Sequence, residues 1–192
     1  MKAFLEKQRH RSCRRYSIKW ETKQVKDIFE IKRGNVLSKK EIHDTPDEIF
    51  KYPVYSSQTM NNGLLGYYKD YLYEDAITWT TDGANAGTVR FRPGKFYCTN
   101  VCGVLLSKEG NANNCVAEYL NSITDKYVVK TGNPKLMNNV MADIEIQLPS
   151  LEHQHLIASL LESYDSLIST TQSEQEHLLN IKQQLMTEIF NS

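Results

Sequence analysis

Hydrophobic positions along the chain change their spacing near residue 149. Between residues 144 and 148, apolar and polar side chains alternate, which is the two-residue period of a half-buried strand. Pro149 and Ser150 follow, and from Leu151 onward the chain contains no further Gly or Pro. The pattern predicts a strand, an N-cap at Ser150 and then one helix of about 40 residues, roughly 60 Å long.

This helix carries an apolar seam whose steps alternate between three and four residues, the repeat of a coiled coil. The seam reads Leu161, Tyr164, Ile168, Thr171, Gln175, Leu178, Lys182, Leu185 and Ile189. A compact domain cannot cover so long a stripe, so its apolar members are expected to form a dimer interface. The expected interface residues are Leu161, Tyr164, Ile168, Leu178, Leu185 and Ile189. The alternative is a terminal helix packed along its own domain.

Upstream of the helix, residues 17–149 show the mixed pattern of an α/β (α+β) domain. The stretch WETKQVKDIFEIKRG predicts a short helical turn and a strand, and YPVYSS predicts another strand. LLGYYKDYLYEDAITWTT alternates around a turn, and TVRFRPGKFYCTNVCGVLL predicts a hairpin that turns at Pro93-Gly94. CVAEYLNSITDKYVVK has helical spacing. The predicted organisation is a basic leader at 1–16, a mixed-sheet domain at 17–149 and a long C-terminal helix at 150–192.

Composition indicates a folded cytoplasmic protein. The chain has 192 residues, 40% of them hydrophobic and 24% charged, and no apolar run long enough for a membrane span. Its basic N-terminus lacks the apolar core of a secretory signal. Four cysteines without paired spacing favour a reducing compartment over a disulfide framework.

Charge is distributed unevenly along a chain whose net charge is zero. Residues 1–40 hold 13 Lys or Arg against 4 Asp or Glu, and the remainder holds 10 against 19. The first part is therefore suited to bind a polyanion, although a solvated basic tail would give the same count.

Catalytic and metal-binding motifs do not emerge from the sequence. Cys98 and Cys102, like His153 and His155, have no second ligand pair at zinc-site spacing, and the expected interpretation is buried thiols and surface imidazoles. TTDGANAGTVRF lacks both the dinucleotide fingerprint and the P-loop lysine. TGNPKL lacks the aromatic residue that methyltransferases place after Asn-Pro-Pro. We therefore expect no catalytic residues, no metal and no cofactor.

The polar loops carry a different signal. SSQTMNNG and TTDGANAG are rich in side chains that hydrogen-bond to base edges, and Lys and Arg residues nearby suit phosphate contacts. The expected DNA-binding residues are Ser57, Gln58, Thr59, Asn61, Asn62, Thr80, Thr81 and Asn85, with Arg33, Lys39 and Lys40 on phosphates and a lesser contribution from Asn133 and Lys135. Ordinary solvated loops remain the alternative.

Taken together, these motifs resemble the specificity (S) subunit of type I restriction–modification systems. The family's target-recognition domain ends with a Gly and an Asn, an alternating strand, and a Pro-x-Leu-Glu-Glu-Gln-x-x-Ile helix start. Here that start reads Pro149, Leu151, Glu152, His153, Gln154 and Ile157, with His153 in place of the usual Glu. ITWTTDGANAGTVRFRPGKFYCTN is similar to the family's strand, Gly-Ala-x-x-Gly turn and hairpin. The resemblance covers roughly residues 17–190.

The resemblance implies a function and a shape. Full-length S subunits have two recognition domains and two conserved helices, which pair antiparallel and hold the domains apart, and each domain reads half of a split site. One domain and one helix look like half of such a subunit, so the helix is expected to form an antiparallel coiled coil in a homodimer. The implied partners are double-stranded DNA, a modification (methyltransferase) subunit that uses S-adenosylmethionine, and a restriction subunit that uses ATP.

A rival interpretation from a different class is a coiled-coil adaptor whose globular domain binds a protein. The uneven charge and the polar loops favour DNA over a protein ligand. A salt-dependent shift of duplex DNA would separate the two interpretations.

Overall fold

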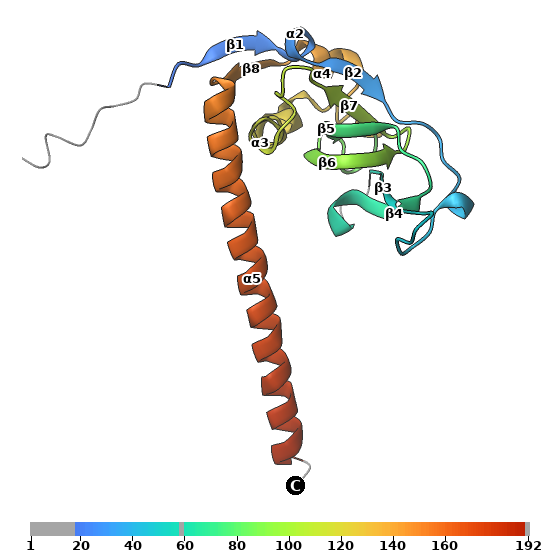
Figure 1. The fold of residues 1–192 in the computed structure, drawn as a ribbon, viewed down its shortest axis with the longest axis vertical. Helices are drawn as coiled ribbons and strands as arrows, with labels where there is room; N and C mark the ends of the chain where they lie inside the picture. Colours follow the sequence, from blue (N-terminus) through green and yellow to red (C-terminus); the bar gives the residue numbers. More distant parts are fainter. Residues whose placement is uncertain (1–17, 58–59, 191–192) are drawn as a thin grey trace, which may run out of the picture.

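The protein consists of a sheet domain at one end of a single long helix (Figure 1). The computed structural model describes residues 18–57 and 60–190. The basic leader predicted at 1–16 and the predicted contacts Gln58 and Thr59 lie outside the described residues.

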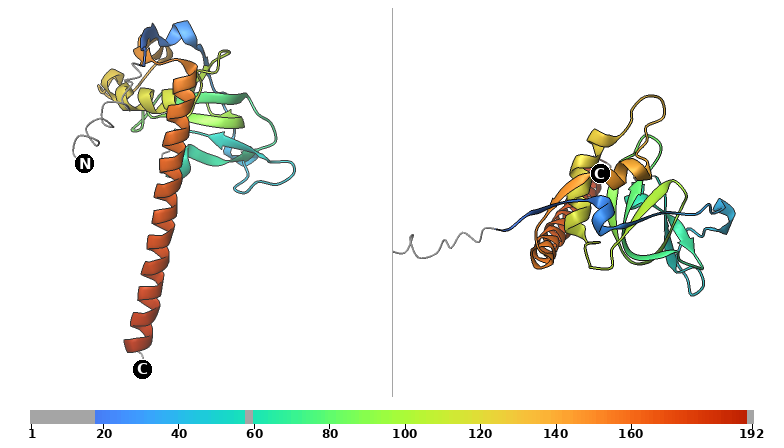
Figure 2. Two further views of the ribbon diagram at one scale, coloured as in Figure 1. Left: turned by 60° about the vertical axis from the view of Figure 1, so that its left-hand side comes forward. Right: turned by 90° about the horizontal axis from the view of Figure 1, so that it is seen from above.

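Six strands form the central sheet in the order β2-β7-β5-β6-β3-β4. All neighbours pair antiparallel except β3 and β6, which are parallel. The sheet is therefore mixed, as the sequence predicted, and its strands curl around one another when seen from above (Figure 2). The strands are β2 (Glu30–Arg33), β3 (Tyr52–Tyr55), β4 (Leu64–Tyr68), β5 (Tyr73–Thr80), β6 (Val89–Cys98) and β7 (Cys102–Leu106).

The two faces of this sheet differ in chemistry. On one face, apolar residues of β5 and β6 join α3 (Asn114–Ile123) and α4 (Asn138–Asp143) in the main core, which includes Ile77, Trp79 and Leu120. The helix predicted near Val116 is thus confirmed, and its buried side faces the sheet. The opposite face holds a smaller cluster that includes Phe96, Cys98 and Cys102.

A separate two-stranded sheet joins the beginning and end of the domain. β1 (Glu21–Gln24) pairs antiparallel with β8 (Glu145–Leu148), and α2 (Val25–Ile28) follows β1 directly. Ile146 and Leu148 are buried while Glu145 and Gln147 are exposed, so the alternation seen in the sequence is confirmed. Because α5 follows β8 directly, the start of the long helix lies beside the pair of strands that joins the first and last segments of the domain.

The predicted hairpin turn at Pro93-Gly94 is wrong. β6 continues through both residues to Cys98, and the chain turns at Thr99–Val101 instead. β6 and β7 do not form a hairpin with each other, because both pair with β5, one on each side. A bulge explains the misleading signal, because the register with β5 shifts between Glu74 and Ala76. Gly94 (φ +69°) and Asp75 (φ +45°) take left-handed conformations, and the Asp75 carboxylate accepts a 2.7 Å hydrogen bond from the Gly94 amide. Pro-Gly here bends a strand rather than reversing it.

The long helix α5 spans Leu151–Phe190, 40 residues without a break. Its first intrahelical bond runs from the Gln154 amide to the Ser150 carbonyl, so Ser150 stands at the N-cap as predicted. His153, which replaces the family's usual Glu, places its Nδ1 2.7 Å from the Ser150 hydroxyl. The imidazole thereby keeps a polar contact with the N-cap residue.

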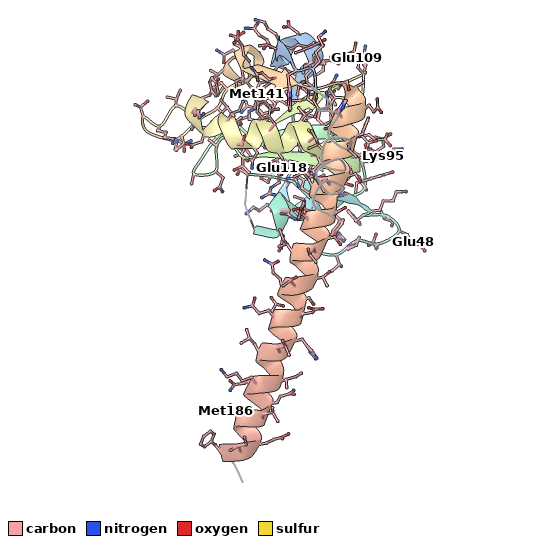
Figure 3. All side chains as sticks on the ribbon, turned by 90° about the vertical axis from the view of Figure 1, so that its left-hand side faces the viewer. Glu48, Lys95, Glu109, Glu118, Met141 and Met186 are labelled. Carbon is pink, nitrogen blue, oxygen red and sulfur yellow. The ribbon has the colours of Figure 1, made fainter. Side chains whose placement is uncertain are left out.

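Only the first turns of α5 touch the domain. Gln154, 2% exposed, donates to Asn111 Oδ1 and the Pro149 carbonyl and accepts from Asn113 Nδ2. Ala158 is also buried, and Leu161 is partly buried. From Glu162 to Phe190 every residue is exposed, and the side chains surround a helix that projects away from the domain (Figure 3).

Candidate nucleic-acid interface

A buried tryptophan organises the end of β5 from which a predicted loop departs. Trp79 is 1% exposed, and its Nε1 donates a 3.0 Å hydrogen bond to the Leu136 carbonyl. Gly103 on the neighbouring strand β7 leaves room for the indole, because a Cβ at this position would lie only 2.1 Å from the Trp79 ring. The indole therefore ties the segment around residue 136 to the sheet, next to the loop that begins at Thr81.

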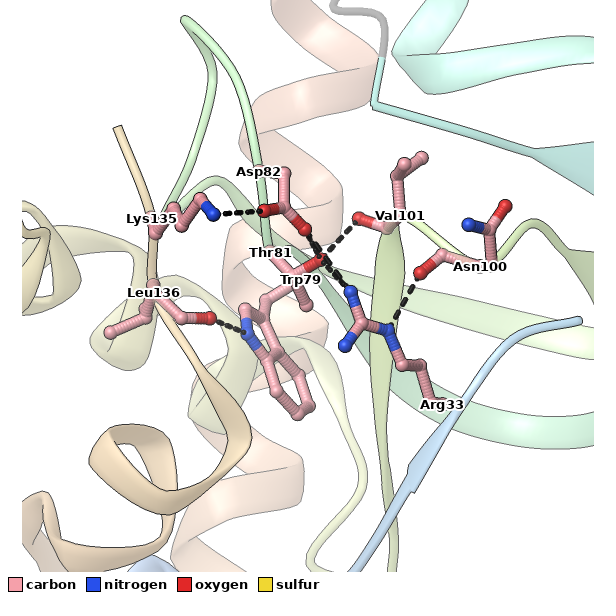
Figure 4. Close-up of polar contacts among 8 residues, drawn as sticks. All are labelled: Arg33, Trp79, Thr81, Asp82, Asn100, Val101, Lys135 and Leu136. Atoms are coloured by element: carbon pink, nitrogen blue, oxygen red, sulfur yellow. Dashed lines mark hydrogen bonds and ion pairs between the residues drawn. The ribbon is translucent and has the colours of Figure 1, made fainter. Parts of the chain in front are cut away.

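Arg33, at the end of β2, is the centre of a polar cluster in this region (Figure 4). Its Nε donates to the Asn100 carbonyl at 2.7 Å, and its Nη2 donates to Thr81 Oγ1 and to the Asp82 carboxylate, both at 3.1 Å. The Thr81 hydroxyl donates to Asp82 at 2.7 Å. The guanidinium group is thus fixed in orientation by three partners while it stays partly exposed.

The segment that carries Asn133 and Lys135 joins the same cluster. Lys135 Nζ lies 3.9 Å from the second Asp82 oxygen, and the Gly83 amide donates to the Pro134 carbonyl. Asn133 is exposed beside them. Asp82 consequently links two loops and was not singled out from the sequence, although it stands within the quoted TTDGANAG stretch.

The loop that contains Asn61 and Asn62 is attached to the 81–87 loop from its other side. Asn85 Nδ2 donates a 3.0 Å hydrogen bond to the Ser57 carbonyl. The loop closes on itself where the Ser56 amide donates to the Gly63 carbonyl. Asn61 (φ +48°) and Asn62 (φ +55°) are exposed in left-handed conformations, which Asn tolerates better than most residues.

The structure therefore brings most of the predicted contacts together around the 81–87 loop, which hydrogen-bonds to the two other loops and to Arg33 at the end of β2. We call this the loop surface, and define it as Arg33, Ser57, Asn61, Asn62, Asp82, Asn85, Asn133 and Lys135. It combines amide groups that can pair with base edges and cations that can pair with phosphates.

Other predicted contacts lie elsewhere or are buried. Lys39 and Lys40 are exposed in the 3₁₀ turn η1 (Lys39–Glu41), at the outer edge of the domain beyond β4 (Figure 1). Thr80 and Thr81 are 6% and 0% exposed. The Thr81 hydroxyl also lies 3.0 Å from the Val101 carbonyl, so its hydrogen bonds are made within the protein.

The cysteines in this part of the domain are buried, as the sequence indicated. Burial raises the pKa of the Cys102 thiol to about 11 and raises the pKa of Cys98 further. Both thiols therefore stay protonated at neutral pH, which disfavours metal binding. Within residues 18–57 and 60–190, no three His, Cys, Asp or Glu side chains are grouped to hold a metal ion. No helix in those ranges is long and apolar enough to cross a bilayer.

Comparison with known proteins identifies the class to which this fold and surface belong. Residues 17–180 match the type I restriction modification DNA specificity domain. Because the match covers most of the chain, the protein belongs to this family. The membership bears out the expectation of a specificity component without catalysis of its own.

Similar chains are found among the specificity subunits of Mycoplasma pneumoniae (strain ATCC 29342 / M129 / Subtype 1). The protein described as the N-terminus of the type I specificity subunit S.MpnORF289P is 42% identical over 146 residues. The match covers 74% of this chain and 76% of that protein. The specificity subunit of the type I restriction enzyme MpnII is 42% identical over 154 residues, covering 79% of this chain and 46% of that subunit. For six M. pneumoniae relatives, the match spans between 42% and 63% of their length.

Solved structures share the fold at lower sequence identity. The S subunit of a type I restriction–modification system from M. genitalium aligns with a TM-score of 0.66 at 19% identity, covering 82% of this chain and 42% of that one. The HsdS subunit from Thermoanaerobacter tengcongensis aligns with a TM-score of 0.55 at 11% identity, covering 84% and 41%. These likenesses confirm the fold of a mixed-sheet domain followed by a long helix.

Proposed function

We propose that this protein reads one half of a bipartite DNA target for a type I restriction–modification complex. The single observation that carries the proposal is the loop surface, where amide and cationic side chains are gathered because the 81–87 loop bonds to two other loops and to Arg33 of β2. Such an arrangement positions donors and acceptors before DNA arrives, which favours selective binding. Family membership supports the same function.

We assign the predicted contacts separate roles according to their exposure. Exposed Asn61, Asn62 and Asn133 are suited to read base edges, since the carbonyl oxygen and the NH2 group of an Asn side chain can together pair with adenine. Arg33 and Lys135 are suited to hold phosphates. We assign buried Thr80 and Thr81 a supporting role, because their side chains hold the loop rather than face the solvent.

We further propose that α5 pairs with α5 of a second copy in an antiparallel coiled coil. Exposed Tyr164, Ile168, Leu178 and Leu185 continue the seam for many turns beyond the last contact with the domain. The polar member Thr171 already donates its hydroxyl to the Leu167 carbonyl at 2.9 Å, so enclosing it would leave no unpaired donor. A buried apolar stripe of this length stabilises a dimer well.

The seam is self-complementary when it is reversed. With the two-fold axis near residue 173, Leu161 faces Leu185 of the second copy, Ile168 faces Leu178, and Thr171 faces Gln175. Apolar residues then meet apolar residues in the first two pairs, Thr171 and Gln175 meet each other, and the third polar member of the seam, Lys182, faces Tyr164. The domains would stand at opposite ends of the pair and read an inverted, interrupted target, with the spacer set by the helix.

Cross-linking tests this register. The double variant Ile168→Cys, Leu178→Cys should form a covalent dimer under mild oxidation, because these two positions face each other across the proposed axis. Each single variant serves as a control and should cross-link poorly. Efficient cross-linking of Ile168→Cys alone would instead indicate a parallel pair.

To test DNA recognition, the protein is expressed together with its cognate modification subunit, which we propose transfers the methyl group. Mapping methylated sites across a genome should return one inverted, split sequence. A target without inverted symmetry would contradict the homodimer. If the protein assembles through α5 but duplex DNA shows no salt-dependent shift, the adaptor function replaces the one proposed here.

A further inference from the structure

Two arginines of β6 lie on the face of the sheet away from the helix-covered core. Val89 and Phe91 point into that core, so Arg90 and Arg92, at the alternate positions, leave the other face. Arg92 is only 7% exposed, and its guanidinium carbon lies 3.7 Å from the centre of the Tyr55 ring. This stacking fixes the plane of the Arg92 side chain.

Neither arginine forms an ion pair with another described residue. None of the ion pairs found in residues 18–57 and 60–190 includes Arg90 or Arg92. Arg92 Nε donates to the neutral Thr78 hydroxyl at 3.1 Å. Burial, and secondarily the neighbouring charge of Arg90, lower the pKa of Arg92. Because buried arginines are normally paired with anions, this face is prepared for an anion that comes from outside the chain.

The arginine pair is connected to the loop surface through the strands that carry it. Arg90 is the cross-strand partner of Thr78, two residues before β5 ends at Thr80 and the 81–87 loop begins. Tyr55, which stacks on Arg92, ends β3 and leads through Ser56 into the loop held by Asn85. An anion bound at Arg90 would therefore lie next to groups that the proposed function assigns to DNA.

We propose that Arg90 binds a backbone phosphate of duplex DNA and that Arg92 is a positioning residue, a fixed cation behind it. Partly buried Arg90 has the reach and the forked donors for a phosphate. Arg92 is too enclosed to make that contact itself. Its charge in a weakly solvated site raises the positive potential around Arg90. This inference rests on the proposed function and adds a contact that period-two alternation in TVRFRP could have revealed.

Arg90→Gln tests the contact with random-sequence duplex DNA. The substitution should weaken binding about tenfold. It should also make the dependence of log K on log salt shallower by about 0.9. Lys26→Gln is the matched control, because it removes one charge from α2, where Lys26 pairs with Asp143 at 2.8 Å, and leaves the β6 arginine face unchanged. It should bind DNA as the unmodified protein does.

The outcomes separate the inference from the function on which it rests. If Arg90→Gln and Lys26→Gln bind DNA equally well, Arg90 makes no phosphate contact while the proposed function stands. If the unmodified protein itself binds no DNA, the proposed function fails, and this inference fails with it.

Arg92 is tested by rescue. Arg92→Met should weaken DNA binding severalfold, whereas Arg92→Lys should restore most of the affinity, because the potential depends on the charge rather than on the stacked plane. Thermal unfolding of both variants establishes that they fold. Equal affinity of Arg92→Met and the unmodified protein would overturn the positioning role. If Arg92→Met does not fold, the Arg92→Lys affinity decides, since a loss as large as that of Arg90→Gln would also overturn it.

Discussion

The loop surface and the projecting part of α5 meet opposite requirements. On the loop surface, Arg33, Asp82 and Asn85 bind groups of neighbouring loops, so the local structure is complete within one chain. Along α5 beyond Leu161, the apolar seam has exposed members such as Ile168 and Leu178. A polar surface can be complete while it faces water, whereas a long exposed apolar stripe is typical of an interaction site. This difference is the basis on which we propose a ligand-binding role for the loop surface and an assembly role for α5.

Charge on the seam should produce the largest effect. The double variant Leu178→Glu, Leu185→Glu places like charges in the proposed interface, so the dimer should dissociate to monomers while the domain keeps its unfolding temperature. Light scattering at micromolar concentration gives the mass. Ser173→Glu, Asn180→Glu adds the same charge on the opposite side of the helix and should leave the dimer intact. If both double variants have the same mass in solution, the seam is not part of the interface.

The junction between the two regions should respond next. Gln154→Ala removes the side chain that bonds Asn111, Asn113 and the Pro149 carbonyl, leaving buried polar groups unpaired. We expect the free energy of unfolding to fall by about 1–3 kcal/mol. Chemical denaturation measures it. His155→Ala, at the exposed neighbouring position, should change it little, and an equal loss in both variants would argue against the anchoring role of Gln154.

Removing a base-reading side chain from the loop surface should cost a similar free energy, but only in binding to the cognate site. Asn62→Gly keeps the left-handed backbone, which Gly tolerates, and removes only the amide group. Affinity for the cognate half-site should fall by about 1–3 kcal/mol, with little change on random DNA. Titration of both duplexes by fluorescence anisotropy provides the measurement. Equal losses on the two would assign Asn62 to the backbone rather than to a base.

The smallest effect is expected at the cations outside the loop surface. Lys39 and Lys40 lie in η1, and neither joins the hydrogen-bonded loops. The double variant Lys39→Gln, Lys40→Gln should weaken binding to all DNA sequences alike, with a shallower salt slope by about 0.9 for each lysine that contacts a phosphate. Arg33→Gln should weaken binding more, because it also releases Asp82. An unchanged slope would place η1 outside the interface.

Sequence patterns identified the elements whose residues interact over short distances. The alternation in β8, the amphipathic α3 and the unbroken α5 all follow from spacing alone. Pro93-Gly94 misled because a bulge and a turn use the same residues, and only the register with β5 distinguishes them. Local chemistry therefore predicted most elements, misplaced one turn, and left the strand β1 and the helix α4 unpredicted.

Contacts between distant segments explain what the sequence could not reveal. The pairing of β1 with β8 joins residues more than a hundred positions apart. Arg33 was chosen from its charge, but its partner Asp82 depends on how β2 and β5 align around β7. The stacking of Arg92 on Tyr55 likewise requires the parallel pairing of β3 with β6. Each of these contacts is set by topology rather than by neighbours in the chain.

The chain contains two tryptophans, and their surroundings give the molecule a built-in optical reporter. Trp79 is enclosed and bonded to the Leu136 carbonyl, one residue from Lys135, whereas Trp20 is half exposed. Replacing Trp20 by Phe would leave Trp79 as the single tryptophan, which can be excited selectively over the tyrosines. If Lys135 leaves Asp82 to contact DNA, as proposed, the emission of Trp79 should change, and binding could then be followed in real time without an added label.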